Sequence, residues 1–232
     1  MQVIIDKRFH GPDGSGNGGY VAGLLAGHVA SDTVTVALRQ PPPLDTELRV
    51  SDDDERGRSV RLWEGDRLIA EGLAAAIVVP PVPAVPYAEA LRAAEGYLGR
   101  GDDHPFPGCF VCGPAREPGD GMRLAPGPVG EGTVAAAWTP REAPGRELLW
   151  AAMDCPGAWS FDPVDRPAVL GTMTGQVVDL PEAGEECVVM GLARSREGRK
   201  LHTATALYGA DGRLLGRAEQ IWIEVDRERF GR

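Results

Sequence analysis

Cysteine and lysine are both scarce in this sequence. Four cysteines among 232 residues are too few for a disulfide-stabilised scaffold, so we expect the chain to fold through a hydrophobic core. Lys7 and Lys200 are the only lysines, although arginine is frequent. We interpret this imbalance as an effect of genome composition and not as a functional signal.

The sequence also lacks an excess of positive charge and any long apolar run. Its formal net charge is −10, which argues against a general nucleic-acid or membrane-surface binder. No apolar run reaches the roughly 20 residues that a membrane-spanning helix needs. The first residues, Met1–Asp6, do not resemble a signal peptide. We therefore expect a cytoplasmic protein with no nucleic-acid partner and no membrane association.

A glycine-rich segment leads into a run of small and apolar residues that predicts a buried helix over about 17–30. Asn17 suits the N-cap, because its side chain can accept from free amides of the first turn. Gly18 and Gly19 follow, and without Cβ atoms they let a carbonyl or phosphate reach the backbone at the positive end of the helix. The amides of Gly18, Gly19 and Tyr20 are therefore candidate donors. A flexible loop entering a core helix is the alternative.

The two halves of the chain show the same order of elements. In the first half, strands are expected at residues 3–5, 33–38, 48–50, 59–63 and 68–79. In the second half, strands are expected at 122–124 and 133–138, a helix at 146–161, and strands at about 168–180, 186–194, 200–208 and 214–225. A proline-rich linker and a short helix of about 87–99 lie between them. The repeat predicts a fused pseudo-dimer with units at 1–80 and 122–232, joined by 81–121.

Three segments then resemble a known family. They are Asn17-Gly18-Gly19 at the helix start, Cys109-Phe110-Val111-Cys112-Gly113 before Gly121-Met122-Arg123-Leu124, and the closing pair Gly212-Arg213-Leu214-Leu215 and Ala218-Glu219-Gln220-Ile221-Trp222. Together they resemble hotdog-fold acyl-CoA thioesterases of the phenylacetyl-CoA and 4-hydroxybenzoyl-CoA type, in the double-hotdog form. The resemblance implies an α+β fold, in which each unit wraps a long antiparallel sheet around one buried helix. It also implies an acyl-CoA or aryl-acyl thioester as substrate, no further cofactor, and a homodimer of fused chains.

The same resemblance implies where the active site lies. In that family an amide at the start of one helix polarises the thioester carbonyl, and an acidic residue on the partner helix attacks it or activates water. Counting nine residues from Gly145 reaches Asp154, whereas the same count from Asn17 reaches Ala26. One site per chain is therefore implied, with amides from Asn17–Gly19 and the carboxylate of Asp154. Gly145 is followed by arginine and glutamate, so a second amide pocket is not expected.

The residues around Asp154 independently favour a chemical role. It stands among small and apolar residues, where a charge is costly and the pKa of a carboxyl tends to rise. Such a carboxylate is a candidate general base or nucleophile. A structural role near Pro156, where the helix must bend, is the alternative.

Cys109 and Cys112 form an isolated Cys-x-x-Cys pair in a loop rich in glycine and proline. A zinc site would need two more ligands, and His104 is the only near one. A redox pair would more often begin a helix. We therefore expect a loop-packing motif and no metal, with Cys155 and Cys187 as small buried apolar residues.

One basic cluster stands out in the acidic chain: Arg194, Arg196, Arg199 and Lys200, in an expected hairpin. It is either a solvated turn or, together with Tyr20, part of a binding site for the phosphates of coenzyme A. Two other functions stay open at this stage. A hotdog dehydratase or hydratase would need a histidine–acid pair facing the groove, and a non-catalytic acyl-CoA-binding protein would need no acid at all.

Overall fold

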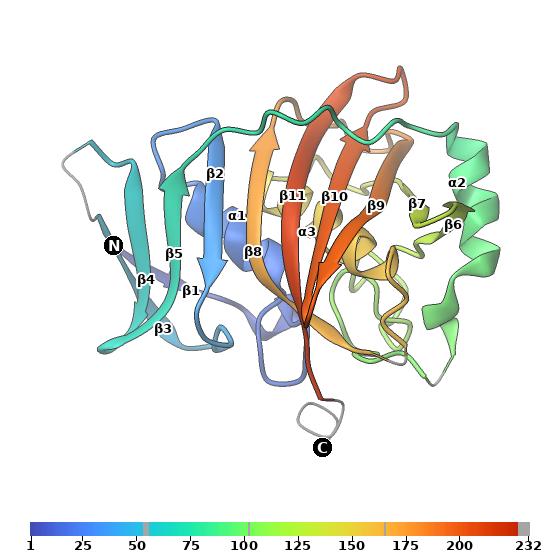
Figure 1. Ribbon diagram of the computed structural model, residues 1–232. Coiled ribbons are helices and arrows are strands. Elements are labelled where there is room, and N and C mark those ends of the chain that lie inside the picture. Colours follow the sequence, from blue (N-terminus) through green and yellow to red (C-terminus); the bar gives the residue numbers. More distant parts are fainter. Residues whose placement is uncertain (53–55, 102, 165, 227–232) are drawn as a thin grey trace.

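A computed structural model describes residues 1–52, 56–101, 103–164 and 166–226, and its main feature is one curved antiparallel sheet (Figure 1). The N-terminal half contributes β1 (Gln2–Ile4), α1 (Gly18–Ala26), β2 (Thr33–Leu38), β3 (Glu47–Asp52), β4 (Ser59–Glu64) and β5 (Arg67–Ala74). The C-terminal half contributes β6 (Gly127–Gly130), β7 (Thr133–Trp138), α3 (Arg146–Trp159), β8 (Ala168–Val177), β9 (Cys187–Glu197), β10 (Lys200–Tyr208) and β11 (Leu214–Glu224). The helix α2 (Tyr87–Ala93) lies between the halves in sequence.

The strand order shows the expected internal repeat. The 11 strands run β1-β3-β4-β5-β2-β8-β11-β10-β9-β7-β6. Within this order β1-β3-β4-β5-β2 and β7-β9-β10-β11-β8 are the same arrangement, read toward the centre from opposite edges. The halves join where β2 pairs antiparallel with β8, and a hydroxyl contact of 2.8 Å between Thr35 and Thr174 lies in that seam. Two meanders therefore form one continuous sheet.

The helix α1 begins where the sequence predicts and ends earlier. The Asn17 side chain accepts from the amide of Tyr20 at 2.9 Å and caps the first turn. The expected helix of about 17–30 stops at Ala26, because the amides of His28 and Val29 bond three residues back, to Leu25 and Ala26. This tighter turn ends the helix and redirects the chain toward β2.

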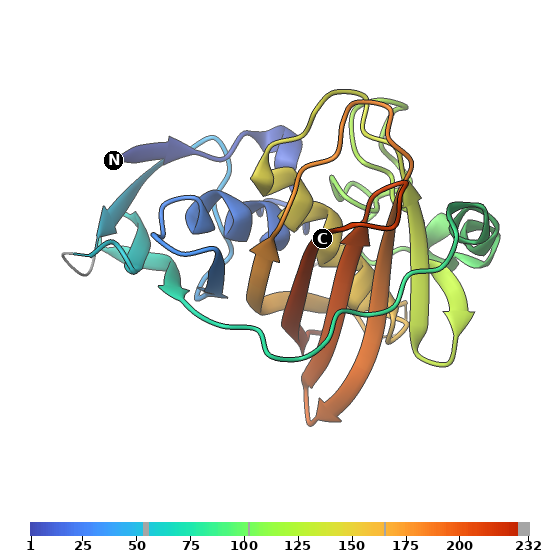
Figure 2. The same cartoon turned by 90° about the horizontal axis from the view of Figure 1, so that it is seen from above.

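Of the expected strands, one is shorter than predicted and another is absent. The strand expected at 68–79 ends at Ala74, and residues 75–86 leave the sheet and cross its outer face (Figures 1 and 2). There the Tyr208 hydroxyl donates to the carbonyl of Val82 at 2.7 Å. Residues 122–124 are not a strand, because the amides of Met122 and Leu124 bond to Phe110 and Val111 in the cysteine loop.

The helix expected over about 87–99 is shorter than predicted. It continues past α2 only as two short 3-10 turns, Ala94–Gly96 and Leu98–Arg100. Proline-rich chain on one side and glycines on the other limit its length.

The inner face of the sheet holds α1 and α3, which pack directly on each other (Figure 2). Every residue of α3 from Leu149 to Trp159 is buried. The two helices approach closely because Gly19 and Gly23, one turn apart on α1, present no side chain to α3. A Cβ at Gly23 would lie 2.7 Å from both the Cα of Glu147 and the Cβ of Trp150. The glycines thus set the separation of the two central helices.

Substituting Gly23 by alanine tests this packing. We expect Gly23→Ala to lower the free energy of unfolding by about 2 kcal/mol, because the strain of overpacking exceeds alanine's gain in helix propensity. Gly27→Ala is the matched control. Gly27 has a helical φ of −61°, and the nearest atom to an added Cβ is 3.4 Å away. Chemical denaturation of both variants checks this, and equal stabilities would contradict it.

Candidate active site

A cavity of about 310 Å³ opens between the two halves of the molecule. Its walls come from the loop before α1, the β2–β3 connection, the cysteine loop, α3, and the ends of β8 and β11. The residues that line it include Asn17, Gly18, Leu38, His104, Phe106, Cys109, Cys112, Asp154, Cys155, Trp159, Leu170 and Trp222. Most of this lining is apolar, so the few polar groups in it are well defined.

Among the described residues that line this cavity, Asp154 is the only one with a carboxylate, and one of its two oxygens is held in place. It lies in the middle of α3, with 2% of its surface exposed. The Asn17 side chain donates from Nδ2 to Asp154 Oδ2 at 2.8 Å. Within the described part of the chain, Oδ1 is buried without a hydrogen-bond partner. One oxygen therefore fixes the carboxylate, and the other is free to act on a bound molecule.

Burial raises the pKa of Asp154 to about 7. Loss of hydration is the main cause, because it penalises the charged form. The neighbouring Cys109 thiolate raises it further, whereas hydrogen bonds from the Gly19 backbone and the Asn17 side chain lower it. The carboxyl is thus held near the pH at which it can both accept and release a proton.

The amides at the start of α1 differ in whether an acceptor within the protein already takes them. The Tyr20 amide is taken by Asn17 Oδ1, and the Gly19 backbone lies against the Asp154 carboxyl, whose pKa it lowers. Gly18 lines the cavity, and none of the described residues accepts from its amide. Gly18 is therefore the amide left to polarise a carbonyl, and Tyr20, expected as a further donor, cannot serve as one.

Gly19 is required for a different reason than the sequence suggested. A Cβ at this position would collide with the Cβ of Asp154 and lie 2.7 Å from the carbonyl oxygen of Trp150. The glycine thus allows α3 to bring its carboxylate against the start of α1. Its importance lies in helix packing as well as in its amide.

The side chains expected to bind coenzyme A lie outside the cavity lining. Tyr20 stacks on Phe9, with ring centroids 3.9 Å apart, and is half-buried. Arg196 pairs with Glu224 at 2.7 Å, while Arg194, Arg199 and Lys200 are exposed around the β9–β10 turn.

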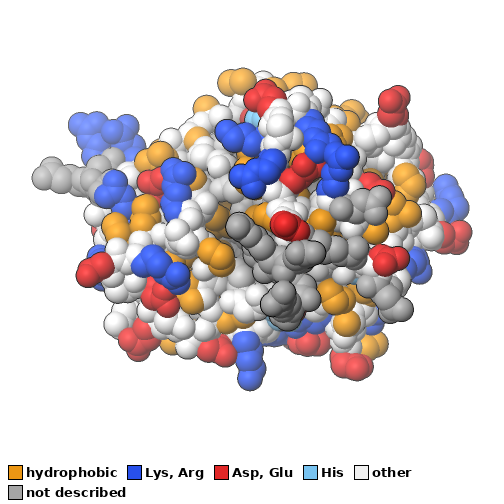
Figure 3. Space-filling view, turned by 60° about the horizontal axis from the view of Figure 1, so that its bottom comes forward, with side chains coloured by type: hydrophobic (Ala, Val, Ile, Leu, Met, Phe, Trp, Pro, Cys, Tyr) orange, Lys and Arg blue, Asp and Glu red, His pale blue; other side chains and the backbone are white. Residues whose placement is uncertain are grey.

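This basic turn lies at the cavity end of the sheet. Lys200 is opposite Ile223 in the ladder, and Ile223 lines the cavity. Figure 3 brings that end of the molecule forward and shows Lys and Arg side chains gathered there. The turn therefore lies outside the lining, at the same end of the sheet as the cavity.

The pseudo-symmetric position, where a second site would form, has different residues. Ala26 stands where an acid would be needed, and with Arg146 it lines a separate hollow. The N-terminus of α3 has no side-chain cap, and Glu147 folds back over Gly145. The helix position equivalent to Asp154 therefore carries no acid, although Asp32 lines this hollow, and the glycine pair of the first site is missing.

Cys155 and His104 are placed in ways that sequence alone did not indicate. Cys155 was expected only as a small buried residue, yet its Sγ lies 3.8 Å from that of Cys109. Since 46 residues separate the two, only the fold could reveal the contact. His104 is buried, with Nε2 3.0 Å from the Tyr97 hydroxyl and Nδ1 accepting from the amide of Phe106 at 2.9 Å. Burial lowers the pKa of His104.

Comparison with solved structures places this fold among known ones. It is similar to the Mycobacterium avium subspecies paratuberculosis TesB protein, with TM-score 0.60, 12% identity, and coverage of 91% of this chain and 88% of that one. It is similar to a hot-dog-fold protein from Alicyclobacillus acidocaldarius, with TM-score 0.62, 14% identity, and coverage of 97% and 92%. It is also similar to acyl-CoA thioesterase II TesB2 from Mycobacterium marinum, with TM-score 0.58, 13% identity, and coverage of 97% and 92%.

These similarities confirm the expected α+β double hotdog fold. At such low identity they establish the fold alone. Comparisons of the sequence with protein-family models and with curated proteins give no match. Among the described residues, no helix is long and apolar enough to cross a membrane.

The raised pKa of Asp154 predicts a pH-dependent stability. The protonated form is favoured in the folded state, so its contribution is fully present below about pH 4 and is lost as the pH rises through about 7. A shift from 3.8 to about 7 corresponds to roughly 4 kcal/mol. We therefore expect Asp154→Asn to gain stability relative to the wild type across this range. Urea unfolding in EDTA-containing buffers from pH 4 to pH 9 measures it, and parallel pH profiles would contradict it.

Proposed function

We propose that this chain hydrolyses an acyl thioester, with coenzyme A as the thiol, at the cavity between its two halves. The observation that carries the proposal is Asp154, which lines the cavity beside the start of α1 and whose buried Oδ1 has no hydrogen-bond partner among the described residues. A carboxylate with one oxygen fixed and the other available is suited to activating a nucleophile. The helix start beside it is suited to a carbonyl oxygen.

The chemistry follows from these two groups. The carbonyl oxygen of the thioester accepts from the Gly18 amide at the positive end of α1, which stabilises the negative charge that develops on it. Asp154 Oδ1 takes a proton from a water molecule, whose oxygen then bonds to the carbonyl carbon. The tetrahedral intermediate collapses, the carbon–sulfur bond breaks, and the thiolate leaves with its electron pair. Direct attack by Asp154, through an acyl-enzyme anhydride, uses the same placement.

The cavity supports a compact acyl group. Its volume of about 310 Å³ is at the small end of the range for ligand sites. Phe106, Trp159 and Trp222 contribute aromatic surface to its lining. We therefore infer a preference for a short or aromatic acyl chain, with the coenzyme A portion extending toward the basic β9–β10 turn. Assembly into a homodimer stays a prediction.

Two other functions are less well supported by the cavity. A hydratase would need a histidine paired with an acid, yet His104 bonds to Tyr97 and Phe106. A purely binding protein would have no need to bury an unpartnered carboxylate oxygen, which is costly. The absence of turnover with retained ligand binding would favour the binding function.

Substitution of Asp154 tests the hydrolase. Acyl-CoA esters from acetyl to palmitoyl, with benzoyl and phenylacetyl examples, are assayed for thiol release. We expect Asp154→Asn to lower kcat at least about 100-fold, because the proton acceptor is lost. The best ester should still raise the melting temperature of the variant. Asp32→Asn, in the pseudo-symmetric hollow, is the matched control and should keep normal turnover. Equal activity of both variants would contradict the assignment of Asp154.

The basic turn gives a separate prediction about coenzyme A. Reversing the charge in the double variant Arg199→Glu, Lys200→Glu should raise KM roughly tenfold with kcat unchanged, because exposed pairs with phosphate contribute modestly. The effect should shrink at high salt. Arg92→Glu on α2 is the control for a charge reversal elsewhere, with half the change in net charge. An unchanged KM would mean that the turn is only a solvated hairpin.

A further inference from the structure

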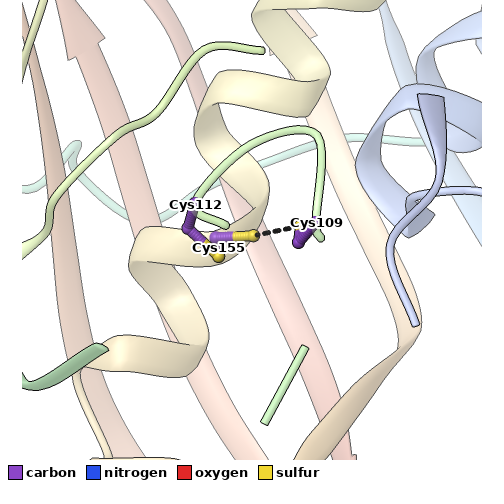
Figure 4. Close-up of side chains that lie close together, drawn as sticks. All are labelled: Cys109, Cys112 and Cys155. Atoms are coloured by element: carbon purple, nitrogen blue, oxygen red, sulfur yellow. Dashed lines mark hydrogen bonds between the residues drawn. The ribbon is translucent and has the colours of Figure 1, made fainter. Parts of the chain in front are cut away.

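Three cysteines from two parts of the chain converge on one wall of the cavity (Figure 4). Cys109 and Cys112 come from the cysteine loop at residues 109–113, and Cys155 comes from α3. Their three Sγ atoms all lie within 4.8 Å of one another, and all three side chains are buried. Glycine at position 113 permits this tight loop, because an added Cβ there would lie only 2.5 Å from the amide nitrogen of Cys109.

All three cysteines are free thiols in a buried site. Besides its contact with Cys155, the Cys109 sulfur accepts from Asn17 Nδ2 at 3.9 Å. Each thiol can therefore supply a thiolate ligand when a cation displaces its proton.

The spacing of the sulfurs matches a tetrahedral cation. A zinc–sulfur bond of about 2.3 Å places two sulfurs of a tetrahedral site about 3.8 Å apart. The Sγ atoms of Cys109 and Cys155 are 3.8 Å apart. A Cys-x-x-Cys pair is also a common chelating unit for zinc, and sulfur donors select thiophilic ions.

We propose that Cys109, Cys112 and Cys155 form a binding site for one thiophilic divalent cation, of which Zn²⁺ fits best. The cation takes three thiolate ligands, and the protons of the three thiols leave to solvent. Within the described residues, no fourth histidine, cysteine or carboxylate lies within 4.8 Å of all three sulfurs. The fourth position is therefore left to water or a small ligand in the cavity. This proposal differs from the expectation that the Cys-x-x-Cys loop is a packing motif with no metal.

The bound cation would join the cysteine loop to α3 directly beside Asp154. In the structure, the contact of 3.8 Å between the sulfurs of Cys109 and Cys155 joins this loop to α3. Metal binding is thus expected to stabilise the folded state, because the converged sulfurs exist only there.

Metal titration tests the site without reference to catalysis. The full chain is reduced with a phosphine, stripped with EDTA and desalted, and then titrated with Zn²⁺ against a chromogenic chelator. One Zn²⁺ per chain is expected, together with a higher melting temperature that EDTA reverses. Titration with Co²⁺ should give the near-ultraviolet charge-transfer absorption of thiolate ligands.

Cysteine variants identify the ligands. Cys112→Ser and Cys155→Ser should each weaken Zn²⁺ binding by more than about 100-fold, since even partners outside the coordination sphere change affinity by 10- to 100-fold. Cys187→Ser, at the fourth cysteine, which is buried on β9, is the matched control and should bind normally. Circular dichroism shows whether each variant is folded. Failure of the reduced wild type to bind Zn²⁺, or equal binding by Cys155→Ser and Cys187→Ser, would overturn the proposal. An inactive protein that still binds Zn²⁺ would contradict only the hydrolase.

Discussion

The close approach of α1 and α3 is the contact on which the rest of the site depends. Gly19 and Gly23 remove the side chains that would hold the helices apart, so the backbone of one touches the other. As a result, a carboxylate in the middle of a buried helix reaches the N-terminus of its neighbour. Asn17 caps α1 with one side-chain atom and holds Asp154 with another. The packing of α1 against α3 therefore also assembles the site.

The duplicated fold explains why the site is asymmetric. Both halves have the same strand order, and their seam at β2 and β8 makes one sheet that encloses both helices. Equivalent positions have nevertheless diverged. Ala26 occupies the position on α1 that corresponds to Asp154 on α3, and Glu147 covers Gly145. A fused chain can keep the amides in one unit and the acid in the other, because each unit is present once. A symmetric dimer of identical units cannot separate the two in this way.

The apolar cavity holds two ionisable side chains, a carboxyl and a thiol, whose pKa values are both shifted. Burial raises the pKa of Asp154, and the hydrogen bonds to the Cys109 sulfur lower the pKa of that thiol. Both groups line the cavity, and the Cys109 sulfur raises the pKa of Asp154. The carboxylate and the sulfur cluster are therefore coupled electrostatically. Occupation of either one is expected to alter the other.

The sequence by itself determined most of the helices and strands and the candidate polar groups of the site. The N-cap at Asn17, the buried character of the segment around Asp154 and the repeat of meanders are all local patterns, so they could be predicted. Only the tertiary structure decided what the start of α1 meets, because Gly19 lies against Asp154 of a helix far away in the sequence. It also decided that Cys155 joins Cys109. Contacts between residues far apart in sequence depend on helix packing, which leaves no local pattern in the chain.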